Sequence, residues 1–252
     1  DVAPSRGLGD VYKRQIVHRT MITAGLPESM LAKAIETWEN ALPPYLKLAY
    51  LPNPGAVRLR LSAYEVEGES VSKEIERQFE ALRRIIPHNI IGYETATMQE
   101  LIHKLLTERR QTLATAESCT GGTIAARFTA MPGASAYFLC GVVSYSNASK
   151  QAVLGVDPDT IARYGAVSEQ VARQMAEGAR RISGADYAVS TTGIAGPAGG
   201  TAEKPVGTVW IAVAGPRRTV ALLKQCGSDR GQIIDRAGAF ALGLLRDELN
   251  GK

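Results

Sequence analysis

Residues 112–122 read Thr-Leu-Ala-Thr-Ala-Glu-Ser-Cys-Thr-Gly-Gly, a short apolar stretch that ends in small hydroxyl, thiol and glycine residues. The apolar part is typical of a buried strand, and apolar residues at helical spacing follow from Thr123. A strand that turns into a helix through small residues presents a side-chain oxygen and unpaired backbone N–H groups at the end of a sheet. Ser118 is therefore a candidate nucleophile, and the N–H groups of residues 119–122 are candidates for binding an oxyanion.

Strands alternate with helices from residue 96 to the C-terminus. We expect strands at residues 112–116, 139–145, 185–191, 206–213 and 219–224. This alternation predicts a three-layer α/β/α domain with a mostly parallel sheet, and the last two strands are expected to form an antiparallel hairpin at one edge.

The chain before residue 96 has a different pattern, typical of a small α+β unit. Val57, Leu59 and Leu61 alternate with polar residues, which is the period of a half-buried strand. The first residues mix proline, glycine and charges without periodicity, so we expect a disordered or non-native leader there. The predicted organisation is a leader at 1–15, an α+β domain at 16–95 and an α/β domain at 96–252.

The bulk composition argues against several classes of protein. The net charge of the 252 residues is +4, but the basic residues are scattered, so the charge permits nucleic-acid binding without indicating it. No stretch approaches the roughly 18 consecutive apolar residues of a membrane span. Three cysteines without a Cys-x-x-Cys motif or a Cys/His cluster predict neither a disulfide framework nor a metal site. We expect a protein of the reducing cytoplasm.

Histidine placement limits the mechanisms open to Ser118. The only histidines, His18, His88 and His103, all precede it, so a local Ser-His-Asp triad is not expected. Lysine is the usual substitute base when burial lowers its pKa. Lys150 is the best placed, because it follows a strand end and ligands bind where the carboxyl ends of parallel strands meet. The alternative is an exposed lysine on the next helix.

Two further segments are candidates for holding a ligand. Residues 191–201 read Thr-Thr-Gly-Ile-Ala-Gly-Pro-Ala-Gly-Gly-Thr, and such a loop binds phosphate or ribose or is simply a tight turn. Its spacing fits neither the Walker motif nor the dinucleotide fingerprint. Arg230 is expected in the first turn of the last helix, where the helix dipole disfavours a cation. A ligand phosphate would explain this placement, and so would a salt bridge to Asp229 or Glu203.

Cys119 is a rival nucleophile, because a thiol at a helix N-terminus has a lowered pKa. No histidine follows it in the chain, so we rank it below Ser118 and expect a small buried residue beneath the turn.

Together these motifs resemble the C-terminal domain of the competence/damage-inducible CinA family. The resemblance rests on residues 115–122, 144–147 with Lys150, 164–169, 192–197 and 204–210, and runs from about Met98 to the C-terminus. Residues 16 to about 93 are similar to the KH-like domain of that family. The resemblance implies that the preceding molybdopterin-binding-type domain, with any nucleotide pyrophosphatase activity, is missing from this sequence.

The resemblance also implies an activity: hydrolysis of the carboxamide of nicotinamide mononucleotide to nicotinic acid mononucleotide and ammonia, in pyridine nucleotide salvage. It implies a serine–lysine mechanism without metal or cofactor, and a homodimer. The expected catalytic residues are Ser118, Lys150 and Tyr145. The expected substrate-binding residues are Thr120, Gly121, Gly122, Asn147, Thr192, Gly193, Gly196 and Arg230.

Two alternatives remain open from the sequence. A catalytically weak family member would act as a nucleic-acid-binding or competence- and DNA-damage-associated module. Against this, residues 52–55 read Pro-Asn-Pro-Gly and not the Gly-x-x-Gly clamp of KH domains, so nucleic acid is not the expected partner. A non-catalytic scaffold, in which the glycine-rich loops are only turns, is the other alternative.

Overall fold

The computed structural model describes residues 16–53, 55–64 and 68–251, which form two compact units that divide between Thr95 and Ala96. The leader predicted at 1–15 lies outside the described residues. Each unit has its own hydrophobic core, as expected for parts of a chain that bury separate apolar faces.

The first unit is an antiparallel sheet covered on one face by two helices. The strands occur in the order β2-β3-β1-β4. Their bounds, with those of the helices, are β1 (Val17–Ala24), α1 (Glu28–Asn40), β2 (Leu46–Asn53), β3 (Ala56–Ala63), α2 (Gly68–Ile85) and β4 (Ile90–Tyr93). Ile35 of α1 and Phe79 of α2 share one core cluster with Leu59 of β3, so both helices pack on the same face of the sheet.

The sequence analysis predicted most of this unit but missed β1. The alternation at Val57, Leu59 and Leu61 is confirmed, because all three side chains lie in the core. Strand β1 lies between β3 and β4, and its residues 20–24 are all buried. A strand buried on both faces shows no alternation of apolar and polar residues, which is why the pattern did not reveal it.

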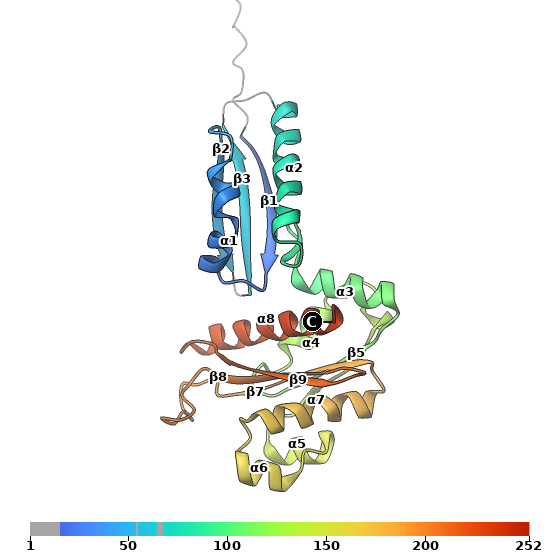
Figure 1. The fold of residues 1–252 in the computed structure, drawn as a ribbon. Coiled ribbons are helices and arrows are strands. Elements are labelled where there is room, and N and C mark those ends of the chain that lie inside the picture. The colour runs from blue at the N-terminus through green and yellow to red at the C-terminus, as the bar shows by residue number, and fades with distance from the viewer. Residues whose placement is uncertain (1–15, 54, 65–67, 252) are drawn as a thin grey trace, which may run out of the picture. The chain divides into compact units, whose positions relative to one another are not determined.

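The second unit has the predicted three layers. Its elements are α3 (Met98–Arg109), β5 (Leu113–Glu117), α4 (Thr123–Thr129), a 3₁₀ turn (Ala134–Ala136), β6 (Phe138–Val143), α5 (Asn147–Leu154), α6 (Pro158–Tyr164), α7 (Glu169–Ser183), β7 (Tyr187–Gly193), β8 (Thr208–Ala214), β9 (Thr219–Gln225) and α8 (Arg230–Leu249). Helices α3, α4 and α8 cover one face of the sheet, and α5, α6 and α7 cover the other (Figure 1).

The sheet is mixed, with the order β6-β5-β7-β8-β9. β5 pairs in parallel with both β6 and β7, whereas β8 runs antiparallel to both β7 and β9. The predicted hairpin of the last two strands is confirmed. The expectation of a mostly parallel, mixed sheet is confirmed, because β6, β5, β7 and β9 run in one direction and β8 alone runs in the other.

Strand direction brings the candidate residues to one edge. Glu117, the last residue of β5, lies in register with Val143 at the end of β6 and with Thr191 near the end of β7. The segments that follow these three strands therefore begin at the same edge of the sheet, which is where ligands bind in open α/β sheets.

Helix α5 follows β6 at this edge, and close packing on α7 holds it in place. Gly178 of α7 is buried, and a Cβ atom at this residue would lie 2.1 Å from the backbone oxygen of Leu154. We expect Gly178→Ala to lower the free energy of unfolding by about 1–3 kcal/mol, because the two helices must move apart. Chemical denaturation measures the change.

Gly243→Ala in α8 is the matched control, because no atom lies within 4 Å of its added Cβ atom. This variant should be neutral or gain up to about 1 kcal/mol from the higher helix propensity of alanine. Equal midpoints for the two variants would show that the contact at Gly178 does not limit stability.

Candidate active site

Ser118 lies in a sharp turn between β5 and α4 and is 8% exposed. Its N–H donates to the backbone oxygen of Thr191 at 3.0 Å, and its backbone oxygen accepts from the N–H of Gly121 at 3.1 Å. Gly121 and Gly122 have φ angles of +62° and +97°, which favour glycine because other residues are strained there. The turn thus fixes the backbone on both sides of the Ser118 hydroxyl.

Lys150 lies on α5, whose first turn is capped by Ser146. The lysine is 2% exposed, which excludes the reading of an exposed helix lysine. Its Nζ atom lies 3.0 Å from Ser118 Oγ, 2.9 Å from the backbone oxygen of Ser144 and 3.3 Å from that of Tyr145. The two residues predicted to meet across adjacent strand ends are therefore within hydrogen-bond distance.

The surroundings of Lys150 favour an uncharged amine. Burial lowers the pKa of Lys150, and no carboxylate of the described residues forms an ion pair with it. A neutral amine has two hydrogens and one lone pair. The carbonyls of Ser144 and Tyr145 accept the two hydrogens, so the lone pair is left for the Ser118 hydroxyl. This is the arrangement that a general base needs.

Cys119 is a poorer nucleophile than its neighbour. Burial raises the pKa of its thiol to about 12, because the thiolate would lose its hydration in the core, and Cys226 adds to the shift. The thiol is therefore protonated near neutral pH. A thiolate at Cys119 would raise the pKa of Lys150, but this effect is absent while the thiol keeps its proton.

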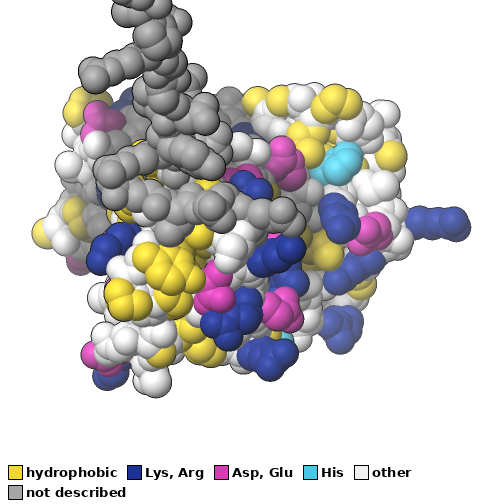
Figure 2. All heavy atoms as spheres, turned by 90° about the horizontal axis from the view of Figure 1, so that it is seen from above, with side chains coloured by type: hydrophobic (Ala, Val, Ile, Leu, Met, Phe, Trp, Pro, Cys, Tyr) yellow, Lys and Arg dark blue, Asp and Glu magenta, His cyan; other side chains and the backbone are white. Residues whose placement is uncertain are grey.

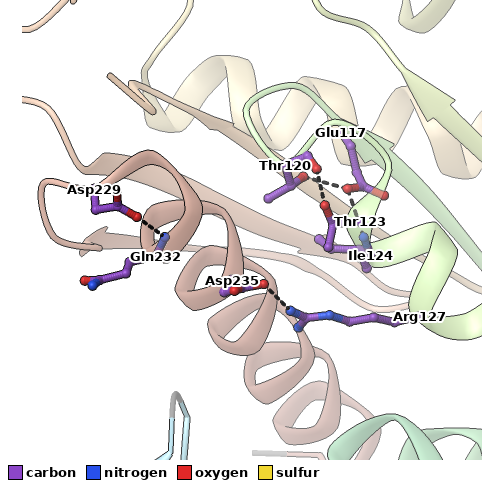
Figure 3. Close-up of polar contacts among 8 residues, drawn as sticks. All are labelled: Glu117, Thr120, Thr123, Ile124, Arg127, Asp229, Gln232 and Asp235. Carbon is purple, nitrogen blue, oxygen red and sulfur yellow. Dashed lines mark hydrogen bonds and ion pairs between the residues drawn. The ribbon is translucent and has the colours of Figure 1, made fainter. Parts of the chain in front are cut away.

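The carboxylate of Glu117 takes the place that an oxyanion was expected to occupy. Its Oε2 atom accepts from Thr120 Oγ1 at 2.6 Å and from the N–H of Ile124 at 3.0 Å (Figure 3). The same atom accepts from the N–H of Gly122 at 3.1 Å. Its Oε1 atom accepts from the N–H of Ala125 at 2.8 Å. The start of α4 already holds an anion, and this anion belongs to the chain itself.

Three predicted substrate-binding residues, Thr120, Gly121 and Gly122, have hydrogen-bond partners within this turn. Thr120 is buried, and its hydroxyl lies against Glu117 and 2.7 Å from Thr191 Oγ1. The N–H groups of Gly121 and Gly122 donate within the turn. None of the three residues lines the cavity described below. Among the backbone hydrogen bonds of the described residues, none is donated by the N–H of Cys119 or of Thr120.

A cavity of about 300 Å³ opens beside Ser118 and Lys150. Six of the other predicted residues line it: Tyr145 and Asn147, which follow β6, Thr192, Gly193 and Gly196 at the end of β7 and in the loop after it, and Arg230 at the start of α8. The other lining residues are Cys119, which was considered only as a rival nucleophile, and Ala166, Val167, Ile194, Ala195, Ala198 and Gly199, which are not among the predicted site residues.

Arg230 lines this cavity and bonds to two of its other lining residues. It is the first residue of α8, whose N-cap Asp229 accepts from the N–H of Gln232 (Figure 3). Arg230 Nη1 donates to the backbone oxygen of Gly196, and Nη2 donates to the Tyr145 hydroxyl, both at 2.9 Å. Within the described ranges no carboxylate pairs with Arg230, so the salt-bridge reading fails there. Its positive charge faces neutral acceptors at a helix N-terminus, where it is uncompensated.

Thr192 is held in place by the segment between α6 and α7. Its hydroxyl donates to the backbone oxygen of Ala166 at 2.8 Å. The segment between α6 and α7 therefore contributes to the cavity. Ala166 and Val167 carry neither charge nor hydroxyl, so their residue types did not indicate a role in the site.

Within the described part of the chain, no group of three or more His, Cys, Asp or Glu residues is arranged to hold a metal ion. No helix there has the length and apolarity that crossing a bilayer requires.

The fold and the site define a three-layer α/β protein with a buried serine–lysine pair at the carboxyl edge of its sheet. The chain belongs to the CinA family. Residues 95–249 match the CinA C-terminal domain, and residues 18–92 match the KH domain of damage-inducible protein CinA.

Curated relatives and solved structures agree with this assignment. CinA-like proteins of Flavobacterium psychrophilum and Cytophaga hutchinsonii are 45% and 42% identical, and each alignment covers 93% of this chain and 56% of the relative. The chain thus spans about half the length of these relatives. The crystal structure of competence/damage inducible protein CihA from Agrobacterium tumefaciens is 41% identical, with a TM-score of 0.59 over 61% of this chain and 93% of that chain. The competence damage-inducible protein A (ComA) of Klebsiella pneumoniae is 35% identical, with the same TM-score over 61% of this chain and 95% of its own.

Proposed function

We propose that the second unit hydrolyses the carboxamide of nicotinamide mononucleotide and releases ammonia. One observation carries the proposal: the buried amine of Lys150 lies 3.0 Å from the Ser118 hydroxyl at the wall of a polar cavity. The substrate class comes from the family resemblance of the motifs. The cavity supports this substrate class, because its lining includes the cation of Arg230, which suits a phosphate, and the hydroxyl of Ser118, which suits an amide carbon.

The proposed chemistry uses only groups of this chain. Ser118 Oγ attacks the carboxamide carbon while Lys150 Nζ takes its proton. The N–H groups of Cys119 and Thr120 stabilise the oxyanion, a contribution of roughly 3–4 kcal/mol per donor. Lys150 then passes the proton to the leaving ammonia, which leaves an ester on Ser118. Water, activated by the same amine, hydrolyses that ester to the carboxylate.

Two charges, one beside the cavity and one in its lining, favour one direction of nucleotide binding. The carboxylate of Glu117 already occupies the start of α4, beside Ser118, and would repel a phosphate there. Arg230 offers an uncompensated guanidinium, and Tyr145 orients it through the hydrogen bond to its hydroxyl. We therefore place the phosphate at Arg230 and the carboxamide at Ser118. Asn147, Thr192, Gly193 and Gly196 lie along the cavity and would contact the rest of the nucleotide.

The test of this function is the release of ammonia from nicotinamide mononucleotide by the purified chain, with nicotinic acid mononucleotide as the second product. Equal release of ammonia and acid supports the proposal. No release at millimolar substrate, from protein that is folded by circular dichroism, would contradict it for this chain.

Arg230→Met should weaken binding of the phosphorylated substrate specifically. Charge-assisted hydrogen bonds contribute about 1.5–3 kcal/mol, so we expect KM to rise about 10- to 100-fold with a smaller change in kcat. The same substrate without its phosphate should bind the variant and the original protein equally well. Steady-state kinetics with both substrates measure this difference.

Arg217→Met is the matched control, because Arg217 lies in the β8–β9 turn, at the end of β8 away from Gly193. It should leave both KM values unchanged. An equal rise of KM for both substrates in Arg230→Met would show that Arg230 holds the cavity in shape and does not bind phosphate.

A nucleic-acid-binding role of the first unit is the second candidate, favoured by its match to a KH domain. On the face shown in Figure 2, Lys and Arg side chains lie among Asp and Glu side chains and form no continuous basic band. The Pro-Asn-Pro-Gly turn falls partly on residue 54, outside the described residues. Binding of single-stranded RNA that weakens with added salt would support this role, and no binding at low salt would end it.

A homodimer remains a proposal from the resemblance alone. Sedimentation equilibrium of the purified chain tests it directly, because a monomer of 26.9 kDa and a dimer differ twofold in mass.

A further inference from the structure

Glu117 is the one fully buried carboxylate of the turn that carries Ser118, and the proposed chemistry gives it no step. Its two oxygens accept four hydrogen bonds, all from the eight residues that follow it. The donors are the Thr120 hydroxyl and the N–H groups of Gly122, Ile124 and Ala125. The side chain therefore ties the whole turn and the start of α4 to the end of β5.

The main chain of the same residue reaches the other member of the pair. The backbone oxygen of Glu117 accepts from the N–H of Ser144 at 2.9 Å. The backbone oxygen of Ser144 in turn accepts from Lys150 Nζ at 2.9 Å. One residue thus fixes the turn that holds the Ser118 hydroxyl and the strand end that holds the Lys150 amine.

Only a carboxylate satisfies this set of partners. All four groups around the side chain are donors, and an ionised carboxylate is an acceptor on both oxygens. Glutamine at residue 117 would turn an NH₂ group toward at least one donor while keeping nearly the same size. Among the described residues no cation pairs with Glu117, so the N–H groups and the hydroxyl are what stabilise its charge.

We propose that Glu117 is a positioning residue, which holds Ser118 Oγ in line with Lys150 Nζ through the hydrogen bonds of its carboxylate to the turn. Glu117 touches no substrate atom. This inference rests on the proposed function for its kinetic readout. It predicts that a change at Glu117 lowers kcat per folded molecule, beyond any decrease in the fraction of folded protein.

Glu117→Gln is expected to lower kcat for amide hydrolysis about 10- to 100-fold, since small misplacements of reacting groups cost up to about 100-fold. KM should change less than about threefold, because Arg230 and the rest of the cavity are untouched. The pH at which the rate rises should stay the same, because burial sets the protonation of Lys150 and Glu117 does not contribute to it. Loss of rate through partial unfolding would instead leave kcat per folded molecule unchanged.

Asp157→Asn is the matched control. Asp157 caps α6 through the N–H of Asp159 and the Thr160 hydroxyl, and it is absent from the cavity lining. This variant also removes a capping carboxylate, but its kcat should equal that of the original protein. Equal effects of Glu117→Gln and Asp157→Asn on kcat would overturn the proposal.

Thr120→Val covers the case in which Glu117→Gln does not fold. It keeps the carboxylate and removes one of the four donors, so kcat should fall about three- to tenfold. The proposal would be overturned if Thr120→Val kept the original kcat while Glu117→Gln failed to fold. It would also be overturned if both variants kept the original kcat.

A substrate-independent measurement separates this inference from the proposed function. A fluorophosphonate probe reacts with a serine that is activated by a base, and mass spectrometry locates the labelled peptide. The rate of labelling at Ser118 should fall about tenfold or more in Glu117→Gln and stay the same in Asp157→Asn. If the original protein is labelled in this way but releases no ammonia, the function fails and the positioning role stands. Equal labelling of all three proteins would refute the role itself.

Discussion

Ser118→Ala is expected to lower kcat for amide hydrolysis by on the order of 10⁴- to 10⁶-fold, the scale seen when a nucleophile that acts with a base is removed. The hydroxyl is the only group of the pair that can form the ester, so the covalent intermediate disappears with it. KM should change little, because alanine keeps the shape of the turn and the binding groups stay in place. Ammonia release under saturating substrate measures the change.

Ser149→Ala is a suitable control for this variant, because Ser149 lies on α5, one residue before Lys150, and its hydroxyl only caps the helix. Its kcat should remain within about threefold of the original value. A Ser118→Ala protein with more than about a tenth of the original kcat would show that another group attacks, with Cys119 the first candidate.

Lys150→Met is expected to lower kcat by about 10²- to 10⁴-fold, the range attributed to a positioned general base. Methionine fills nearly the same buried volume without a proton-accepting atom, so the loss should appear in kcat and not in folding. Because the two residues act as a unit, the double variant Ser118→Ala/Lys150→Met should be no slower than Ser118→Ala alone. Kinetics of the three proteins, with circular dichroism for folding, measure these relations.

Lys104→Met controls for the loss of a lysine, because Lys104 is an exposed residue of α3 that pairs with Glu108. It should leave kcat unchanged. A Lys150→Met protein with the original kcat would contradict the role of Lys150 as base. A double variant whose loss of kcat equals the product of the two single losses would show that Ser118 and Lys150 do not act in the same step.

The protonation of Lys150 also determines the pH dependence. Burial lowers its pKa below the ordinary value of 10.5, and only the neutral amine accepts a proton from Ser118. The rate should therefore rise with pH along a limb centred below 10.5, and Lys150→Met should lose this limb. The buried ammonium destabilises the fold most below the lowered pKa. This destabilisation disappears as pH rises toward 10.5, where the unfolded chain loses its proton as well.

Much of the second unit could be predicted because the pattern of apolar residues within each short segment indicates its helices and strands. Apolar stretches of strand length alternate with amphipathic segments, and this alternation alone led to three layers. The same strands placed Ser118 and Lys150 at one edge, because carboxyl ends of parallel strands meet there. The contact between the two side chains, at 3.0 Å, follows from β5 and β6 being neighbours, which the sequence analysis assumed as a condition and could not derive.

The features that were not predicted leave no mark in the local pattern of apolar and polar residues. Strand β1 is buried on both faces and so shows no alternation. No role was predicted for Glu117, because nothing in the local sequence tells whether its carboxylate turns outward or back onto α4. That orientation decides which N–H groups of the turn have a partner, because those of Gly122, Ile124 and Ala125 donate to Glu117.

The most direct test of the account is to search for the ester on Ser118. Protein mixed with nicotinamide mononucleotide is quenched in acid within milliseconds to seconds, digested and analysed by mass spectrometry. We predict an acyl group derived from the substrate on the peptide that contains Ser118, present during turnover and absent from Ser118→Ala. Turnover with full release of ammonia but no acyl group on that peptide at any time, or an acyl group on Cys119 instead, would contradict the account.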